Sequence, residues 1–211
     1  GGPTGFHRRL WRAAVGENSL TFTRLSCDGE EGYPGNLLVS VRYTFDDECR
    51  LGIHYQALCD QDTVINLTNH SYFNLDGEDS ESVEGQHLQI FADSFAENDA
   101  GCLPTGRIVS LDSEEGAPFD FREPTEIGKR LHEENIHLKN GSGYDHNYLL
   151  KKQPDGLCAR AYSRSSGILL ECRTSEPGMQ LYTGNFLSTS NIVGKGGKSY
   201  AIGDENHDFN W

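Results

Sequence analysis

The chain has 211 residues, of which 36% are hydrophobic, enough for one domain with a sizeable core. Its 18 basic and 32 acidic residues give a formal net charge of -14. This balance argues against a nucleic-acid backbone or an anionic membrane surface as partner. No apolar run approaches the length that spans a bilayer, and no signal-peptide pattern opens the sequence, so we expect a cytoplasmic protein.

Short segments that alternate apolar and polar residues recur in the first sixty positions. Residues 8–15 and 20–27 are predicted to form two strands joined by a turn at 16–18. Residues 39–45 and 51–57 follow the period-two pattern of half-buried strands, and the polar stretch between them predicts a hairpin. The first part of the chain is therefore expected to be an antiparallel sheet.

Residues 64–67, Val-Ile-Asn-Leu, predict a further strand because they are apolar and rich in β-branched side chains. The next ten residues read Thr-Asn-His-Ser-Tyr-Phe-Asn-Leu-Asp-Gly and end in turn-forming residues. His70 is thus expected where a strand runs into a polar loop. A histidine there can transfer a proton near neutral pH, although a lone histidine is more often a structural residue. The acidic stretch at 76–84 lacks the ligand spacing of a calcium loop and predicts a solvated loop.

The second half of the sequence also favours strands. Residues 87–95 predict a strand, and a long loop rich in proline and glycine follows. Residues 124–132 predict one short helix, with a proline near its start. A strand should end at 149–150, residues 157–164 and 168–174 should form a hairpin, and 179–183 should form the last clear strand. Many strands with little helix predict an all-β, antiparallel β-sandwich in a single domain over residues 1–211.

Strand periodicity also assigns the faces of two polar residues. Gln180 should lie on the face opposite Met179 and Leu181, and Asp145 should share a face with Asn147. His146 would then point away from Asp145, so we leave it out of the candidate set. Without further context, the favoured interpretation is structural, with Asp145 as a turn-capping acid and Gln180 as a surface strand residue.

Cysteine and histidine spacing indicates neither a disulfide scaffold nor a metal site. The six cysteines are scattered without a C-x-x-C pair, which favours reduced thiols in a cytosolic protein. The eight histidines lack paired ligand spacing. Glycosylation sequons at Asn66, Asn69 and Asn140 are interpreted as unused matches.

Three strings together resemble the aldose 1-epimerase family, the galactose mutarotases. These are the ten residues around His70, the string Gly-Tyr-Asp-His-Asn-Tyr at 143–148, and the string Glu-Pro-Gly-Met-Gln-Leu-Tyr-Thr-Gly-Asn-Phe at 176–186. They stand in the order of the family's motifs, and the resemblance extends over about residues 1–200. It implies the curved antiparallel sandwich of the galactose mutarotase-like (supersandwich) fold, with a sugar bound on a concave sheet.

The resemblance also implies a reaction and a set of roles. The family interconverts the α and β anomers of free aldohexoses such as galactose and glucose, by acid-base opening and closure of the ring. Such a reaction needs an acid and a base but no cofactor or metal, and its partner is a small sugar. By resemblance, His70 is the acid that serves the ring oxygen. Asp145 would bind sugar hydroxyls, and Gln180 would lie at the rim of the same cleft.

Two functional parts of the family pattern find no match in this sequence. The family's arginine and second histidine come from a segment before the one that matches residues 1–2. Its base is a glutamate on an apolar strand after the segment that matches Tyr200, and residues 201–211 diverge from that strand. Glu205 is the nearest acid there, but we do not assign it the role of base.

We therefore expect a partial mutarotase-like domain, without the family's N-terminal strands and C-terminal end, with weak activity or none. A non-catalytic carbohydrate-binding or regulatory protein of the same fold is the alternative. A plain interaction module would not explain the three motifs. The oligomeric state is not predicted.

Overall fold

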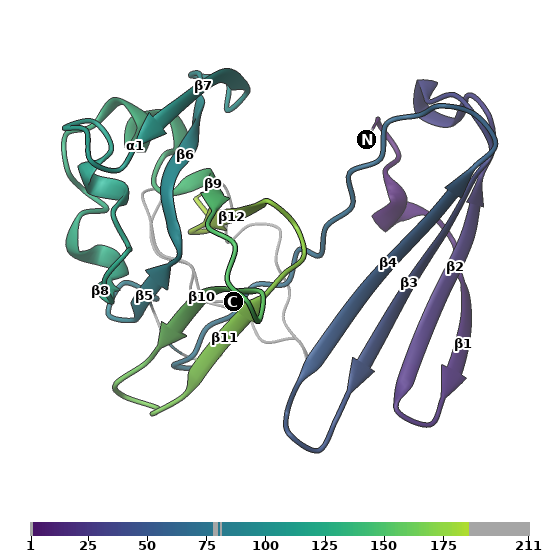
Figure 1. Ribbon diagram of the computed structural model, residues 1–211, viewed down its shortest axis with the longest axis horizontal. Coiled ribbons are helices and arrows are strands. Elements are labelled where there is room, and N and C mark those ends of the chain that lie inside the picture. Colours follow the sequence, from purple (N-terminus) through teal and green to yellow (C-terminus); the bar gives the residue numbers. More distant parts are fainter. Residues whose placement is uncertain (1, 78–79, 81, 186–211) are drawn as a thin grey trace. The chain divides into compact units, whose positions relative to one another are not determined.

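The computed structural model describes residues 2–77, 80 and 82–185. The chain divides into two units, Gly1–His70 and Ser71–Trp211 (Figure 1). The boundary between the units, at His70 and Ser71, lies in a segment that forms neither helix nor strand.

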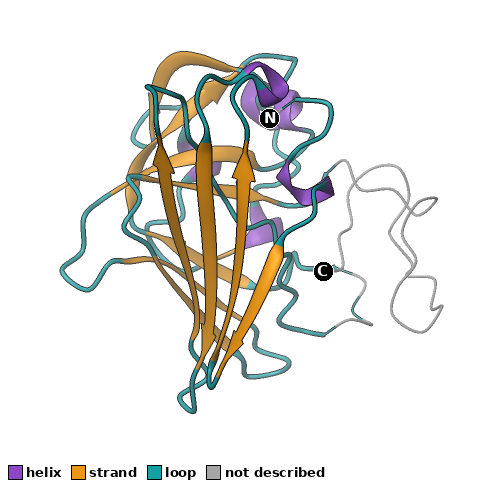
Figure 2. Ribbon diagram, turned by 90° about the vertical axis from the view of Figure 1, so that its right-hand side faces the viewer, coloured by secondary structure: helices purple, strands orange, loops and turns teal. Residues whose placement is uncertain are grey.

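The first unit is a four-stranded antiparallel sheet in the order β1-β2-β3-β4. Its long strands lie side by side in Figure 2. The strands are β1 (Arg12–Gly16), β2 (Ser19–Ser26), β3 (Leu37–Phe45) and β4 (Leu51–Cys59). Two short 3-10 turns, η1 (Phe6–Arg8) and η2 (Glu30–Gly32), flank them in the sequence. The alternating pattern predicted this meander to within a few residues at each strand end.

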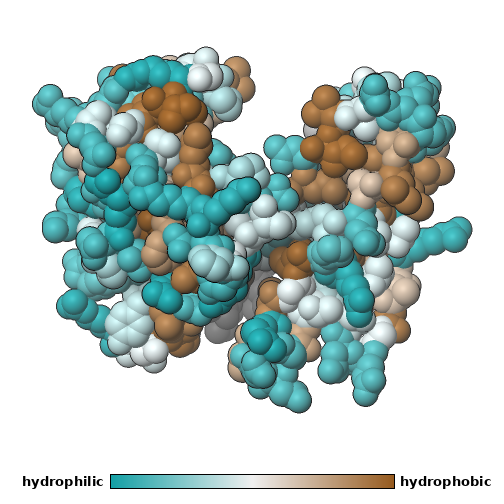
Figure 3. Space-filling model, viewed as in Figure 1, coloured by the Kyte–Doolittle hydropathy of each residue, from teal (hydrophilic) through white to brown (hydrophobic). Residues whose placement is uncertain are grey.

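Charged contacts fasten the turn η2 to this sheet. Arg24 of β2 pairs with Glu30 at 2.6 Å, and Arg9 pairs with Glu31 at 2.9 Å. The first unit also keeps large apolar side chains exposed, and Figure 3 shows apolar surface among hydrophilic surface over it. The exposed apolar residues of its strands include Leu25, Leu38, Phe45, Leu51 and Leu58.

The strand predicted at 64–67 is wrong. Residues 62–74 form neither helix nor strand, and the side chains of Val64 and Ile65 are 76% and 43% exposed. A high β-propensity yields a strand only where a neighbouring strand offers hydrogen bonds and packing. The described residues provide no such pairing for this segment.

The second unit contains two four-stranded sheets, and all paired neighbours in them are antiparallel. One sheet has the order β11-β10-β5-β8 and consists of β11 (Leu169–Arg173), β10 (Leu157–Tyr162), β5 (His87–Ile90) and β8 (Thr125–Glu126). The other has the order β12-β9-β6-β7 and consists of β12 (Gly178–Tyr182), β9 (Asp145–Leu150), β6 (Ala92–Asn98) and β7 (Pro104–Ser110). The predicted all-β, antiparallel fold class is confirmed.

Both sheets of the second unit contribute to one apolar core. Ile90 of β5 and Ala159 of β10 belong to the same buried cluster as Phe95 of β6 and Tyr148 of β9. The ring of Phe95 lies 4.3 Å from that of Phe119, between centroids. The buried hydroxyl of Tyr148 donates to the Phe119 carbonyl at 2.9 Å, so this polar group is satisfied inside the core.

The strand predicted at 87–95 is divided between the two sheets. Its first part is β5 and its second part belongs to β6, with Phe91 between them. The Phe91 N–H donates to the Cys158 carbonyl at 3.0 Å, and the Phe91 carbonyl accepts from Lys151 at 2.8 Å. Phe91 thus bonds to both neighbouring chains while the strand changes sheet.

The helix predicted at 124–132 is also wrong. That segment forms β8 and the 3-10 turn η4 (Ile127–Lys129), because β8 pairs with β5 instead of continuing a helix. The long loop predicted after 95 contains β7 and the 3-10 turn η3 (Ala117–Phe119). An unpredicted helix, α1 (Ile136–Gly141), begins after Asn135, whose side chain accepts from the His137 N–H at 2.9 Å as an N-cap.

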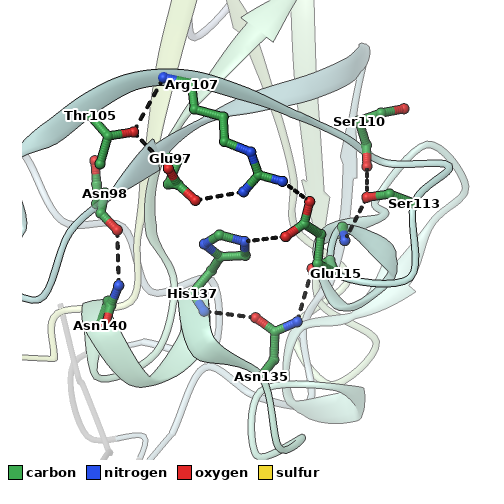
Figure 4. Close-up of polar contacts among 11 residues, drawn as sticks. Glu97, Asn98, Thr105, Arg107, Ser110, Ser113, Glu115, Asn135, His137 and Asn140 are labelled. Atoms are coloured by element: carbon green, nitrogen blue, oxygen red, sulfur yellow. Dashed lines mark hydrogen bonds and ion pairs between the residues drawn. The ribbon is translucent and has the colours of Figure 1, made fainter.

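A polar network holds α1 against β6 and β7 (Figure 4). Arg107 of β7 pairs with Glu97 at 2.6 Å and also with Glu115. Glu115 lies 3.4 Å from His137 Nε2, and its carbonyl accepts from Asn135 Nδ2 at 2.8 Å. The start of the helix is thereby tied to the strands that lead to the candidate site.

Candidate functional site

Two of the three predicted site residues lie together on neighbouring strands. β9 and β12 pair antiparallel, with Asn147 opposite Gln180 and Asp145 opposite Tyr182. Gln180 Nε2 donates to Asp145 Oδ1 at 2.7 Å. Gln180 is exposed, whereas Met179 and Leu181 pack against the core, in agreement with the face predicted from strand periodicity.

The main chain of Asp145 is fixed by one buried and one half-buried asparagine that sequence reasoning missed. Asn98, which is 7% exposed, donates from Nδ2 to the Asp145 carbonyl at 2.8 Å. The Asn98 carbonyl in turn accepts from Asn140 Nδ2 at 2.9 Å, a contact visible in Figure 4. A chain of hydrogen bonds therefore runs from α1 through the end of β6 to the first residue of β9. Asn98 and Asn140 position the carboxylate by holding its backbone.

Two tyrosine rings accompany this carboxylate. The rings of Tyr72 and Tyr182 lie 6.0 Å apart between centroids, and Tyr182 is the register partner of Asp145. Burial raises the pKa of the Tyr72 hydroxyl, and the negative charge of Asp145 raises it further. The influence of Asp145 on this hydroxyl indicates that Tyr72 faces the same part of the second unit.

The group formed by Asp145, Gln180, Tyr72 and Tyr182 can recognise a small polyhydroxylated molecule. The carboxylate and the amide oxygen accept hydrogen bonds from hydroxyl groups, and the amide nitrogen donates. Tyrosine rings add apolar contact area with a polar end. A few convergent polar groups beside aromatic surface are typical of small-molecule sites.

His146 lies on the other face of β9 and belongs to the core. Its side chain is fully buried, and its ring lies 4.6 Å from that of Phe119 and 5.2 Å from that of Phe95, between centroids. Its Nδ1 accepts from the Asp145 N–H at 3.1 Å. Burial lowers the pKa of His146 to about 4, so the ring is neutral at pH 7. Its omission from the candidate set agrees with this geometry.

His70 is the last residue of the first unit and lies in the segment without regular structure. Its neighbour Asn69 donates from Nδ2 to the hydroxyl of Tyr43 on β3 at 3.2 Å, which ties this end of the motif to the first sheet. The convergence of His70 with Asp145 and Gln180 stays a prediction.

The first acid of the stretch 76–84 is held by hydrogen bonds, whereas residues 78, 79 and 81 of the predicted solvated loop lie outside the described residues. Asp76 accepts hydrogen bonds from the hydroxyls of Ser163 and Ser165 and from Gln86 Nε2 at 3.1 Å. These bonds lower the pKa of Asp76. Asp76, although partly exposed, therefore anchors the turn between β10 and β11.

The described part of the chain contains neither a cluster of metal ligands nor a helix that could cross a membrane. In residues 2–77, 80 and 82–185, no group of three or more histidine, cysteine or acidic residues is arranged to hold a metal ion. Within the same residues, no helix has both the length and the apolar character needed to cross a membrane. The divergent stretch 201–211, with Glu205, lies outside the described residues.

Comparison with known proteins gives a consistent result. The sequence model of the family described as aldose 1-epimerase matches residues 1–210. Galactose mutarotase from Bos taurus is 44% identical over 201 residues, which cover 95% of this chain and 56% of that protein. Aldose 1-epimerase from Escherichia coli (strain K12) is 38% identical over 190 residues, covering 89% of this chain and 54% of that protein. The chain thus spans about half the length of these curated relatives.

Solved structures resemble the fold as well. An aldose epimerase homologue from C. elegans matches with a TM-score of 0.82 and 31% sequence identity, over 98% of this chain and 59% of that chain. A galactose 1-epimerase from Lactobacillus acidophilus NCFM matches with a TM-score of 0.76 and 29% identity, over 91% of this chain and 56% of that chain.

Proposed function

Because the chain belongs to the aldose 1-epimerase family, we propose that it acts in the interconversion of the α and β anomers of free aldohexoses, galactose and glucose among them. The observation that carries this proposal is the hydrogen-bonded pair of Asp145 and Gln180 on adjacent strands, each from a different family motif. A cytoplasmic location and a small sugar as partner follow from the same proposal. The family match over residues 1–210 supports one mutarotase-like domain over residues 1–211.

The proposed chemistry is a proton transfer at each end of the ring-opening step. An acid protonates the ring oxygen while a base removes the proton of the anomeric hydroxyl, and the two roles are exchanged when the ring closes. His70 is the proposed acid. Asp145 accepts hydrogen bonds from sugar hydroxyls, and Gln180 orients the carboxylate while it offers its own amide at the rim.

The motif of His70 continues through Tyr72 into the second unit. His70 precedes Tyr72 by two positions, so the covalent chain keeps their Cα atoms within about 7.6 Å of each other. Tyr72 in turn contacts Tyr182, the register partner of Asp145. Tyr72 thus brings the second half of this motif to the strand pair of Asp145 and Gln180, and the role of His70 is proposed from its place in the same motif.

The chain alone is expected to accelerate mutarotation feebly or not at all. The proposal assigns no base within residues 201–211, and one positioned acid or base contributes about 10²- to 10⁴-fold to a rate. Polarimetry on freshly dissolved α-galactose measures this. The comparison protein is a chimaera in which the segments of the bovine relative that flank the matched region are joined to this chain.

The chimaera should exceed the 211-residue chain by about 10²-fold or more in rate at equal concentration. Equal rates would mean that Glu205 or another acid of this chain serves as the base. A chimaera that folds, as judged by circular dichroism, yet shows no activity would count against the proposed function itself.

A carbohydrate-binding or regulatory protein without catalysis is the second candidate. The arrangement of Asp145, Gln180 and the two tyrosines favours it, because these groups can bind hydroxyls without a base. In calorimetric titration of the chain with galactose, Asp145→Ala should weaken binding about ten- to a hundredfold, since hydrogen bonds to a charged group contribute about 1.5–3 kcal/mol. Gln180→Ala should weaken it less, because hydrogen bonds from the neutral Gln180 amide to sugar hydroxyls are weaker than those to a carboxylate.

The control variant is Asp47→Ala, which removes the same charge from an exposed turn of the first unit. It should bind galactose as the unchanged chain does. Binding by the chain together with absent turnover would favour the second candidate. An Asp145→Ala variant that binds as tightly as the unchanged chain would refute the assignment of this carboxylate.

A further inference from the structure

A β-bulge in β10 brings an unusual run of residues to the inner face of its sheet. Leu157 is opposite Arg173 and Ala159 is opposite Cys172, so Cys158 is an extra residue in the ladder. A bulge sets two residues of one strand against one residue of its partner and turns successive side chains the same way. Leu157, Cys158 and Ala159 are accordingly all buried.

The bulge places the Cys158 thiol beside Cys172 on β11. Cys158 is 2% exposed, and its Sγ lies 3.2 Å from the Cys172 carbonyl oxygen. Cys172 itself is exposed, and β11 is the terminal strand in the order of its sheet. One thiol is therefore sheltered and the other is accessible from solvent. Because Cys158 and Cys172 are 14 positions apart, their sequence spacing suggested no pairing.

The two thiols also differ in acidity. The Cys158 S–H donates to the Cys172 carbonyl, and the neighbouring Cys158 side chain lowers the pKa of Cys172 to about 7. The same contact, together with burial, raises the pKa of Cys158. Near neutral pH, Cys172 is thus substantially a thiolate, the nucleophilic form, whereas Cys158 keeps its proton.

We propose that Cys158 and Cys172 are a redox-active pair that hydrogen peroxide converts into a disulfide across β10 and β11. In the first step the Cys172 thiolate attacks one peroxide oxygen and the O–O bond breaks. The product is the Cys172 sulfenic acid, and the hydroxide that leaves takes up a proton to become water.

In the second step the sulfur of Cys158 attacks the sulfur of Cys172 and displaces the sulfenic oxygen. This oxygen leaves as water with the proton of the Cys158 thiol. The two thiols together lose two electrons and two protons, and one peroxide molecule is reduced to two molecules of water. A thiol reductant such as dithiothreitol reverses the change by disulfide exchange.

The test uses the full chain, reduced and then treated with one equivalent of hydrogen peroxide before alkylation. Two of the six thiols should be lost. Trypsin cleaves after Lys152, Arg160, Arg164 and Arg173, so Cys158 and Cys172 fall in the separate peptides 153–160 and 165–173. Mass spectrometry should find these two peptides joined and lighter by two hydrogens. Cys27 and Cys49, which are also exposed, serve as internal controls and should remain alkylated.

Variants separate the two steps. Cys158→Ser should accumulate a sulfenic acid on Cys172 that dimedone traps, and Cys158→Ala repeats the measurement if serine at this buried position prevents folding. Cys172→Ser should leave Cys158 reduced under the same peroxide treatment. Failure of peptides 153–160 and 165–173 to join in the unchanged chain would overturn the proposal. Oxidation of Cys27 or Cys49 ahead of Cys172 would overturn it equally.

Discussion

Replacing His70 with asparagine in the chimaera with the bovine flanking segments should lower its rate of mutarotation by about 10²- to 10⁴-fold. Asparagine preserves a polar side chain that can hydrogen-bond to the ring oxygen, but it cannot transfer a proton to it. Ring opening would then depend on water as the acid. The loss should appear mainly in kcat, because sugar binding rests on Asp145 and Gln180.

Polarimetry with α-galactose measures this effect, and His54→Asn is the matched control. His54 is an exposed histidine of β4 in register with Arg42, and it has no place in the proposed site. Its replacement should leave the rate unchanged. If the chimaera keeps its full rate after His70→Asn, the acid is another residue and the motif has been assigned the wrong role.

The strands that could be predicted from the sequence are those whose neighbours are close in the chain. β3 and β4 alternate in sequence and pair through a short hairpin, and β10 and β11 are also joined by a short turn. β7 was missed because six of its seven residues are exposed, which leaves no alternation to detect. It is a strand only because β6 pairs with it. Residues 125–126 likewise form a strand because they pair with the distant β5. Residues 64–67 form none, because no described strand pairs with them.

Of the candidate site, too, the sequence predicted the parts that have a local signal and missed those that depend on distant residues. Asp145 and Gln180 stand in recognisable motifs, and strand periodicity assigned their faces. Asn98 lies 47 positions from Asp145 and acts on its backbone carbonyl, a role for which a sequence has no local signal. The pairing of Cys158 with Cys172 depends on a bulge, and a bulge becomes visible only when the register of both strands is known.

Acidification should destabilise the second unit through His146. The folded-state pKa of this buried histidine is about 4, whereas an unfolded histidine titrates near 6.5. Between these values the unfolded chain binds a proton that the folded chain does not, so the free energy of unfolding falls as the pH falls. Well above pH 6.5, His146 is neutral in both states and does not make the free energy of unfolding depend on pH. It should reach about 3 kcal/mol near pH 4, because each unit of pKa difference corresponds to about 1.4 kcal/mol.

Urea unfolding followed by circular dichroism at pH 7, 5 and 4 measures this loss. His146→Gln retains a side-chain acceptor for the Asp145 N–H but does not titrate. Between pH 7 and pH 4 its free energy of unfolding should therefore fall by about 3 kcal/mol less than that of the unchanged chain. His7→Gln, at an exposed position, should keep the pH dependence of the unchanged chain. The same slope in the His146→Gln variant as in the unchanged chain would show that His146 is not the titrating group. The acid sensitivity would then have to arise from carboxylates whose folded-state pKa values are lowered, such as Asp76 and Asp120, and these lose their contribution at more acidic pH.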